Sequence, residues 1–471
     1  MSTSTNPLGM PLLSFLCAAA AVATAGCGGV YSPAGGSADS GFPEASSDAG
    51  SSAPLDAGTG PTEAGAGAET GTGSGPSDGG TGGGFTPAAH RAFPQVPNTG
   101  KVTTSPMLTT VTASNDTPTD GTDTVASLQA FSDVLPGSGV WSAVSSEYHV
   151  GALTSVAKAT GPAIAAGTIT GDQILAYVGS LVTAGTVAAP TGSNVYLLYL
   201  PSGVTLDTGW CGDHFAYPAT GSLGDEIAVV GRCAPWRDQE TQLGELTRVA
   251  SATVVGAATD PLGQGYNLGE PVSQPWTASV WQAWVSGGHV ELESLCEGTR
   301  IYENASGAPA GGWELQRIYS NAAAAAGGDP CVPAYGEPFY AGSAPQDWYT
   351  VPPGGTVTIP LTGWSAGATS DWLFYAHPAV GNTTGSFDGL ADGGVSVSSS
   401  IGVGSVGPCD VRYALNNGTT ASVDVTAAPD APSGSYVVFR MDFFRENPPP
   451  SCDPPITGDD FHFWPVGVYV P

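Results

Sequence analysis

The chain of 471 residues carries 41 acidic against 11 basic side chains, which gives a formal net charge of −30 at pH 7. This excess of negative charge argues against nucleic acid and anionic membrane surfaces as partners. Only 11% of the residues are charged, while 68 are glycine and 40 are proline, a balance that favours a loop-rich and strand-rich exported protein over a helical cytosolic enzyme.

The first 27 residues have the pattern of a bacterial lipoprotein signal. Residues 12–25 are apolar and end in small side chains, and Ala25-Gly26-Cys27 resembles a lipobox. The apolar run is too short to span a membrane as a helix. We expect lipidation of Cys27, with the membrane as a partner through this lipid, and anchoring at the cell envelope, at the outer membrane. An ordinary secretory signal, which would release the protein, is the alternative because no Lys or Arg precedes Pro11.

Residues 28–92 are expected to be a disordered tether. They consist mainly of Gly, Ser, Ala, Asp, Pro and Thr, so they cannot bury enough apolar surface to fold. A flexible chain of this length has a mean span on the order of 45 Å. Such a tether would hold a folded part clear of the membrane without fixing its orientation.

The cysteines predict disulfides. Cys17 leaves with the signal and Cys27 would carry lipid, so six of the eight cysteines remain. They form neighbouring pairs along the chain: Cys211/Cys233, Cys296/Cys331 and Cys409/Cys452. Sequential pairing is favoured over the other connectivities because each pair lies within one local module. A Cys/His zinc site is the rival interpretation, but the chain has no CxxC spacing.

Strand and helix patterns follow from about residue 93. Residues 102–113 and 194–199 have strand composition, rich in Val, Leu, Thr and Tyr. Helical spacing predicts helices over residues 126–134 and 170–182, the second of them capped by Thr170. A further strand at residues 226–230 and a helix at residues 243–258, which is expected to pack on the sheet, complete this part.

The segment of residues 248–261, RVASATVVGAATDP, organises the first domain. It begins as a small-residue apolar run suited to a buried helix and breaks at Thr259-Asp260-Pro261. The segment resembles the zinc-motif helix of a zincin-like secreted peptidase family of myxobacteria, which is distantly similar to plant phosphate-induced (exordium-like) proteins. That family's helix reads roughly A-S-H-E-x-x-E-A-A-T-D-P, and Ala250-Ser251 and residues 257–261 match it.

The chemical positions of that helix are changed. The family's His is Ala252, the adjacent Glu is Thr253, and the second Glu is Gly256. In the family, His and Glu four residues apart hold zinc on one helix face, and the Glu beside the His acts as general base. A carboxylate that precedes a cysteine by two residues in the family is Ser294 here. We therefore expect no metal, no cofactor and no peptidase catalysis.

The resemblance extends by motif over residues 95–332. It is also carried by residues 148–151 (YHVG), Cys211-Gly212, His214, residues 228–230, Cys233, Gly265-Tyr266-Asn267, residues 289–296 (HVELESLC) and residues 313–321. It implies an α+β fold, a zincin-like mixed sheet-and-helix domain over residues 93–335.

Residues 336–471 are predicted to form an antiparallel β-sandwich domain. Apolar or alternating runs occur at short intervals between Gly, Pro, Asn and Asp clusters, and no long helical pattern interrupts them. The runs are residues 356–361, 372–377, 422–426, 436–443 and 463–470. The fold by itself assigns no role to this domain.

Two sets of residues are candidate sites beyond the altered helix. His289, Glu291 and Glu293 alternate, so on a strand they would share a face and could hold a metal, but period-2 polarity favours a solvated outer face. His214 with Trp276, Trp281 and Trp284 defines a candidate cleft for a peptide or glycan, although packing is the more frequent role of such tryptophans.

Other catalytic patterns give no specific signal. The one G-x-S-x-G match, residues 75–79 (GPSDG), lies in the expected tether and not on a strand-to-helix turn, so a serine hydrolase has no support. The carboxylates that would have to pair in a glycosidase are scattered: Asp213, Asp225, Glu226 and Glu245. The sequence thus predicts an extracytoplasmic, lipid-anchored protein, with an inactive metallopeptidase-like domain that binds a ligand or acts as structure. The alternative is a secreted hydrolase of peptides or polysaccharides that uses residues the sequence does not identify.

Overall fold

The fold is given by a computed structural model. It describes residues 29–30, 85–218, 225–235, 240–269, 274–283, 290–305, 308–309, 312–334, 337–369, 371–381, 395–399, 413–445 and 462–471. The predictions for Cys27 and most of the tether, and those for Trp284, His289, Cys409 and Cys452, fall outside these residues. In the described ranges, no helix combines the length and apolar character that crossing a membrane requires.

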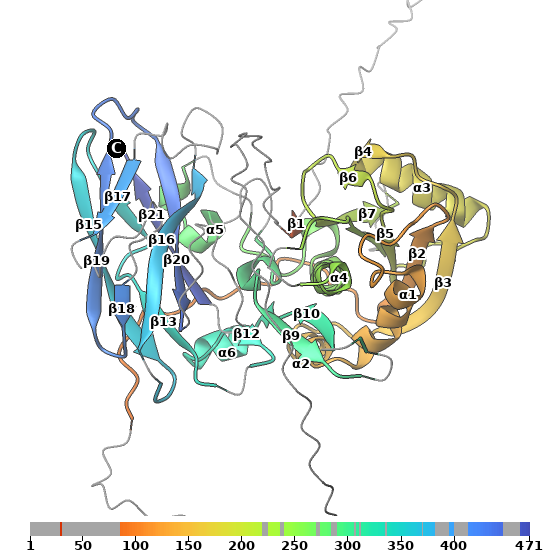
Figure 1. The fold of residues 1–471 in the computed structure, drawn as a ribbon, viewed down its shortest axis with the longest axis horizontal. Helices are drawn as coiled ribbons and strands as arrows, with labels where there is room; N and C mark the ends of the chain where they lie inside the picture. Colours follow the sequence, from red (N-terminus) through yellow and green to blue (C-terminus); the bar gives the residue numbers. More distant parts are fainter. Residues whose placement is uncertain are drawn as a thin grey trace, which may run out of the picture.

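Two lobes lie side by side, a mixed α/β lobe and a β-sandwich (Figure 1). The sheet of the first lobe has the strand order β1-β7-β8-β5-β2-β3. The strands β3, β2, β5 and β8 run parallel to one another, whereas β7 is antiparallel to β8. The bounds are β1 Gly29–Val30, β2 Met107–Ala113, β3 Thr154–Gly161, β5 Asn194–Tyr199, β7 Gly212–Tyr217 and β8 Asp225–Val230.

Helices cover both faces of this sheet because its strands are apolar on both sides. Along β5, Val195 and Leu197 pack with α1, α2 and α4, while Tyr196 and Leu198 pack with α3. The helices span α1 Val125–Val134, α2 Gly139–Glu147, α3 Gly171–Thr183 and α4 Gln242–Thr259. The predicted helices α1, α3 and α4 are confirmed, as is the Thr170 cap, whose hydroxyl accepts from the Gln173 amide.

Helix α4 is the central element of the lobe. Thr241 caps its first turn by accepting from the Gly244 amide, and the helix ends at Thr259, directly before Asp260-Pro261, as predicted. All 18 of its residues are buried. An 18-residue helix without an exposed face is surrounded by protein on every side, so its small side chains are needed to let its neighbours approach.

The second lobe is a sandwich of two sheets, of order β13-β15-β19-β17 and β14-β21-β20-β16-β18. The five predicted strands are confirmed as β15, β16, β19, β20 and β21. The pairing is antiparallel except that β14 runs parallel to β21, which the sequence pattern did not predict. The bounds are β13 Tyr340–Ser343, β14 Trp348–Thr350, β15 Thr356–Ser365, β16 Trp372–Gly381, β17 Val395–Ser399, β18 Tyr413–Leu415, β19 Thr420–Ala427, β20 Tyr436–Phe444 and β21 His462–Tyr469.

Short elements connect the larger ones. They are β4 Gly167–Ile169, β6 Val204–Leu206, β9 Arg300–Glu303, β10 Trp313–Gln316, β11 Ile318–Tyr319, β12 Cys331–Val332, α5 Val280–Ala283 and α6 Asn321–Ala325, with 3₁₀ turns at η1 Leu135–Gly137, η2 Pro261–Gly263, η3 Pro275–Thr277 and η4 Ser294–Cys296. Two of the predicted disulfides are confirmed, Cys211–Cys233 and Cys296–Cys331. Each closes a loop whose chain entropy corresponds to about 3–4 kcal/mol.

The two lobes share one continuous apolar core. Phe93, on the segment that leads into the first lobe, contacts Trp281 of α5, Trp364 of β15 and Trp464 of β21, with ring centroids 5.2–6.1 Å apart. The elements η3 and α5 lie against β21 as well: Trp276 stacks on Tyr469 at 5.0 Å. Residues 275–283, which precede the predicted boundary at 335/336, therefore pack on the sandwich.

Candidate functional site

The helix positions that would carry zinc chemistry hold no donor for it. Ala252, Thr253 and Gly256 are all buried in α4. The Thr253 hydroxyl donates to the Val249 carbonyl at 2.9 Å, so it serves the helix itself. Ser294 lies in η4 and is also buried. Helix α4 thus supplies no metal ligand at these positions, and the polar side chains of this region come from other elements.

Gly256 opens the space that two glutamates fill. A Cβ atom built on Gly256 would lie 2.8 Å from Oε2 of Glu291 and 2.8 Å from Oε1 of Glu293. Real Cβ atoms almost never come so close to oxygen, so the carboxylates occupy the position into which any side chain at residue 256 would project. The two glutamates can therefore occupy this space only because residue 256 has no side chain.

The loop that carries these glutamates does not have the conformation expected from its sequence. The prediction of a strand with a solvated face at residues 289–293 is wrong for the described part, because Glu291 is 0% and Glu293 1% exposed. The chain coils after residue 291: the Leu295 amide donates to the Glu291 carbonyl at 3.3 Å, and the Cys296 amide to the Glu293 carbonyl at 3.1 Å. Coiling brings both carboxylates inward, whereas strand alternation would have placed them on the outside.

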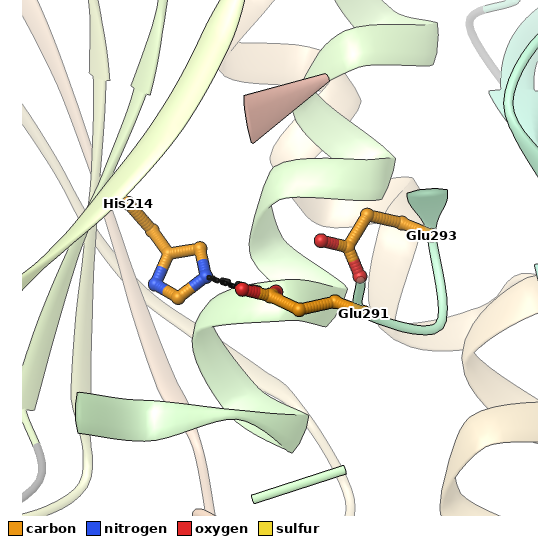
Figure 2. Close-up of side chains that lie close together, drawn as sticks. All are labelled: His214, Glu291 and Glu293. Atoms are coloured by element: carbon orange, nitrogen blue, oxygen red, sulfur yellow. Dashed lines mark hydrogen bonds and ion pairs between the residues drawn. The ribbon is translucent and has the colours of Figure 1, made fainter. Parts of the chain in front are cut away.

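His214 faces the glutamates from the neighbouring strand β7. Its Nε2 atom lies 3.0 Å from Oε2 of Glu291, and its Nδ1 atom lies 3.3 Å from Oε2 of Glu226 on β8. Figure 2 shows the imidazole pointing across to Glu291, with Glu293 beside it on the same loop. Ligand atoms of His214, Glu291 and Glu293 all lie within 4.8 Å of one another. We call these three residues the His–Glu–Glu cluster.

Further carboxylates stand around the His–Glu–Glu cluster. The other oxygen of Glu226 accepts from the Leu262 amide at 2.9 Å. Asp260, which ends α4, accepts from the Gly265 amide and, at 3.0 Å, from the side-chain amide of Asn267. The matched Thr-Asp-Pro sequence therefore ends the helix and holds the turn behind the cluster, which is a structural role.

Burial and mutual repulsion set the charges of the cluster. Burial raises the pKa of Glu291, and burial together with the charge of Glu291 raises the pKa of Glu293 well above its usual value. Burial opposes the charged form of His214, but Glu291 and Glu226 outweigh it and raise the pKa of the imidazole. Burial also raises the pKa of Asp260 to about 6.

This arrangement has two chemical uses. Two carboxyl groups that touch in a dry site cannot both stay ionised without compensation, so they either share a proton or bind a cation. An imidazole with two carboxylates is a donor set that suits zinc and related divalent ions. The Oε2 atom of Glu293 has no hydrogen-bond partner among the described residues.

The described tryptophans of the predicted cleft, Trp276 and Trp281, have packing roles. Trp281 is buried against Phe463 and Trp464, and Trp276 stacks on Tyr469 of the sandwich, so these two candidate tryptophans pack on the second lobe. His214 has glutamates and no tryptophan as its side-chain partners in the contacts described above. The candidate cleft of His214, Trp276, Trp281 and Trp284 is therefore not assembled by the described residues.

The four carboxylates that the sequence left scattered, Asp213, Asp225, Glu226 and Glu245, do not come together as one pair or cluster in the structure. Asp225 accepts from the Asn194 and Gly192 amides at 2.6 and 2.7 Å, and Glu245 pairs with buried Arg248 at 2.7 Å. Asp213 is buried beside His214, and burial raises its pKa to about 7. Of the four, only Glu226 contacts the side chain of a residue of the His–Glu–Glu cluster, a role for which its position inside an apolar strand gave no signal.

The buried carboxyl of Glu297 gives the fold a pH dependence. Burial raises its pKa to about 8, compared with about 4.3 in an unfolded chain. The folded state therefore binds this proton more tightly than the unfolded state, and this contribution to stability is lost as the pH rises from about 4.5 to 8. The Glu297→Gln variant should gain stability relative to the wild type across that range, by up to a few kcal/mol in urea unfolding. An offset between the two proteins that does not change with pH would contradict this.

No protein-family model and no curated protein sequence matches this chain. Among solved structures, it is similar to WR4, an MSP family member of C. elegans, at 12% identity and a TM-score of 0.19 over 28% of this chain and 97% of that one. It is also similar to domain 1 of VCBP3 from Branchiostoma floridae, at 12% identity and a TM-score of 0.16 over 29% and 97%. The class 5 fimbriae chaperone CfaA gives 12% identity and a TM-score of 0.17 over 28% and 56%. Likenesses at these TM-scores assign neither fold nor function.

Proposed function

We propose that this protein is an extracytoplasmic, lipid-anchored surface protein whose first lobe is a zincin-like domain that no longer acts as a peptidase and works as a binding or structural module. The observation that carries the proposal is that α4 lacks metal-binding side chains at the positions of the zinc motif. Its three chemical positions are Ala252, Thr253 and Gly256, and the space beside Gly256 is filled by Glu291 and Glu293. A metal-bound water activated by a helix glutamate has no place in this geometry.

The architecture supports the zincin-like assignment of the first lobe. A mixed sheet packs α4 against one face, and its antiparallel strand β7 lies beside that helix, where Gly212 makes room for Val249 and Thr253. The residues that match the zinc-motif helix lie in α4, and α4 ends at Asp260-Pro261, where the motif predicts the end of the helix. These features support a zincin-like scaffold, in which the three helix positions of the resembled zinc motif carry no metal ligands.

A secreted hydrolase is the second candidate, and the His–Glu–Glu cluster favours it. A histidine and two glutamates are residues that hydrolases use as metal ligands or as acid and base. All three side chains are at most 2% exposed, however, which favours a structural role over contact with a polymeric substrate.

The experiment compares wild-type protein with Cys27→Ser in fractionated cells, followed by assays of the purified proteins on casein and polysaccharides. Lipidation by more than one acyl chain anchors stably, so wild-type protein should stay with the membrane, and Cys27→Ser should be soluble or remain an unprocessed precursor. Neither protein should hydrolyse the substrates. A wild-type N-terminus that is unmodified and starts elsewhere than Cys27 would contradict the anchor. Hydrolysis that disappears in His214→Ala would favour the second candidate.

A further inference from the structure

We propose that His214, Glu291 and Glu293 bind one divalent transition-metal ion of the zinc class, at a site whose carboxylates come from the loop after residue 290 instead of from α4. This inference is independent of lipid anchoring and of peptidase activity. It replaces the expectation from sequence that the domain holds no metal, because that expectation placed Glu291 and Glu293 on a solvated strand face, whereas both are buried.

The spacing of the donor atoms fits such an ion. Zinc holds nitrogen and oxygen ligands at about 2.0–2.2 Å, so neighbouring ligand atoms of a tetrahedral site stand about 3.4 Å apart. Nε2 of His214 lies 3.0 and 3.3 Å from the two oxygens of Glu291, and the whole set falls within 4.8 Å. Small rotations of side chains would therefore be enough to admit the ion.

An unpartnered oxygen supplies the second line of evidence. Glu293 is 1% exposed, and its Oε2 atom has no hydrogen-bond partner among the described residues. A buried acceptor left without a donor is destabilising, and for a carboxylate the effect is larger than for a neutral group. A bound cation would satisfy this oxygen and compensate the negative charges of Glu291 and Glu293 together.

Glu226 fits the role of a residue that orients the histidine ligand. Metal-binding histidines usually donate their second ring N–H to a carboxylate, which fixes the tautomer. Here Oε2 of Glu226 lies 3.3 Å from Nδ1 of His214, while the Leu262 amide holds the other oxygen at 2.9 Å. That contact would keep a proton on Nδ1, so that Nε2, the atom that faces Glu291, is the nitrogen that gives up its proton and binds when a metal enters. Glu226 is thus a positioning residue and not a ligand.

The test titrates the mature full-length chain with Zn²⁺ after treatment with a chelator, in competition with a chromophoric indicator. Wild-type protein should bind one Zn²⁺ per chain, and its unfolding temperature should rise on binding. Glu291→Gln and Glu293→Gln should each weaken binding at least about tenfold, and Glu226→Gln by about 10- to 100-fold. The matched control is Glu297→Gln, which removes another buried carboxylate of the same loop and should bind Zn²⁺ as the wild type does.

Two readouts keep the proposal falsifiable if a variant fails to fold. Co²⁺ added to wild-type protein should give the visible absorption of a low-coordinate site with nitrogen and oxygen ligands, and Zn²⁺ should abolish it. Failure of wild-type protein to bind either ion, or equal Zn²⁺ affinity in the wild type, Glu291→Gln and Glu293→Gln, would overturn the proposal. A Glu293→Gln protein that gains stability while the wild type binds no metal would show instead that the carboxyl pair shares a proton.

Discussion

Replacing Phe93 with alanine will lower the free energy of unfolding by about 3–5 kcal/mol, and it will separate the unfolding of the two lobes. Phe93 is 5% exposed and lies among Trp281, Trp364 and Trp464, which belong to three different elements. Truncation to alanine leaves a cavity lined by large aromatic rings from different elements. These rings cannot move in to fill the cavity unless whole strands shift.

The segment around Phe93 also contacts the first lobe directly. The Tyr319 hydroxyl donates to the Pro94 carbonyl at 2.6 Å, and the Asn321 side chain accepts from the Val96 amide at 2.7 Å. One short stretch is therefore bonded to the first lobe and packed into the sandwich. Loss of the Phe93 ring should weaken the connection between the lobes more than it weakens either lobe.

Calorimetry and urea unfolding measure this effect. The wild type should unfold in one transition and Phe93→Ala in two, with the first at a lower temperature. Phe85→Ala is the control, because Phe85 lies on the same segment but is 42% exposed; its effect should stay within about 0.5 kcal/mol. A single unshifted transition in Phe93→Ala would contradict the shared core.

Gly256→Glu, which places a carboxylate where the helix of the resembled peptidase family has one, will destabilise the protein by about 3 kcal/mol or more and will weaken the proposed zinc binding. The new Cβ alone would stand 2.8 Å from an oxygen of Glu291 and 2.8 Å from one of Glu293. A third carboxyl group would then have to enter a buried region that already holds two. We expect Glu291 and Glu293 to be pushed away from His214.

The control is Gly179→Glu on α3. Gly179 is also within a helix, but its added Cβ would meet nothing closer than the Tyr217 hydroxyl at 3.5 Å. Glutamate has a better helix propensity than glycine, so this variant should be neutral or up to about 1 kcal/mol more stable. If Gly256→Glu were as stable as Gly179→Glu and bound zinc more tightly than the wild type, the helix position would still be open to a ligand.

Local signals predicted most of the fold. Helix α3 has its capping box at Thr170 and Gln173, helix α4 stops at Asp260-Pro261, and the strands of the sandwich follow their runs of Val, Phe and Tyr. Each of these depends on residues close together in the chain. The sequential disulfides Cys211–Cys233 and Cys296–Cys331 are also local.

The site could not be predicted in the same way, because its parts are distant in the chain. His214 and Glu291 are 77 residues apart, and Glu226 comes from a third element. The alternation of residues 289–293 suggested a strand, but the coiled turn there depends on the packing of the loop over α4, where Gly256 leaves space. The resemblance of α4 to a zinc-motif helix could be noted in the sequence, whereas the approach of Glu291 and Glu293 to His214 could not.

Diffraction at the zinc absorption edge from crystals of the full-length chain soaked in Zn²⁺ tests most directly whether the metal ligands of this domain are His214 of β7 and the two loop glutamates, and not residues of α4. A single anomalous peak bounded by Nε2 of His214 and the carboxylates of Glu291 and Glu293 is the predicted result. Fully soaked crystals without a peak at this position, or with a zinc ion held by other residues, would contradict it.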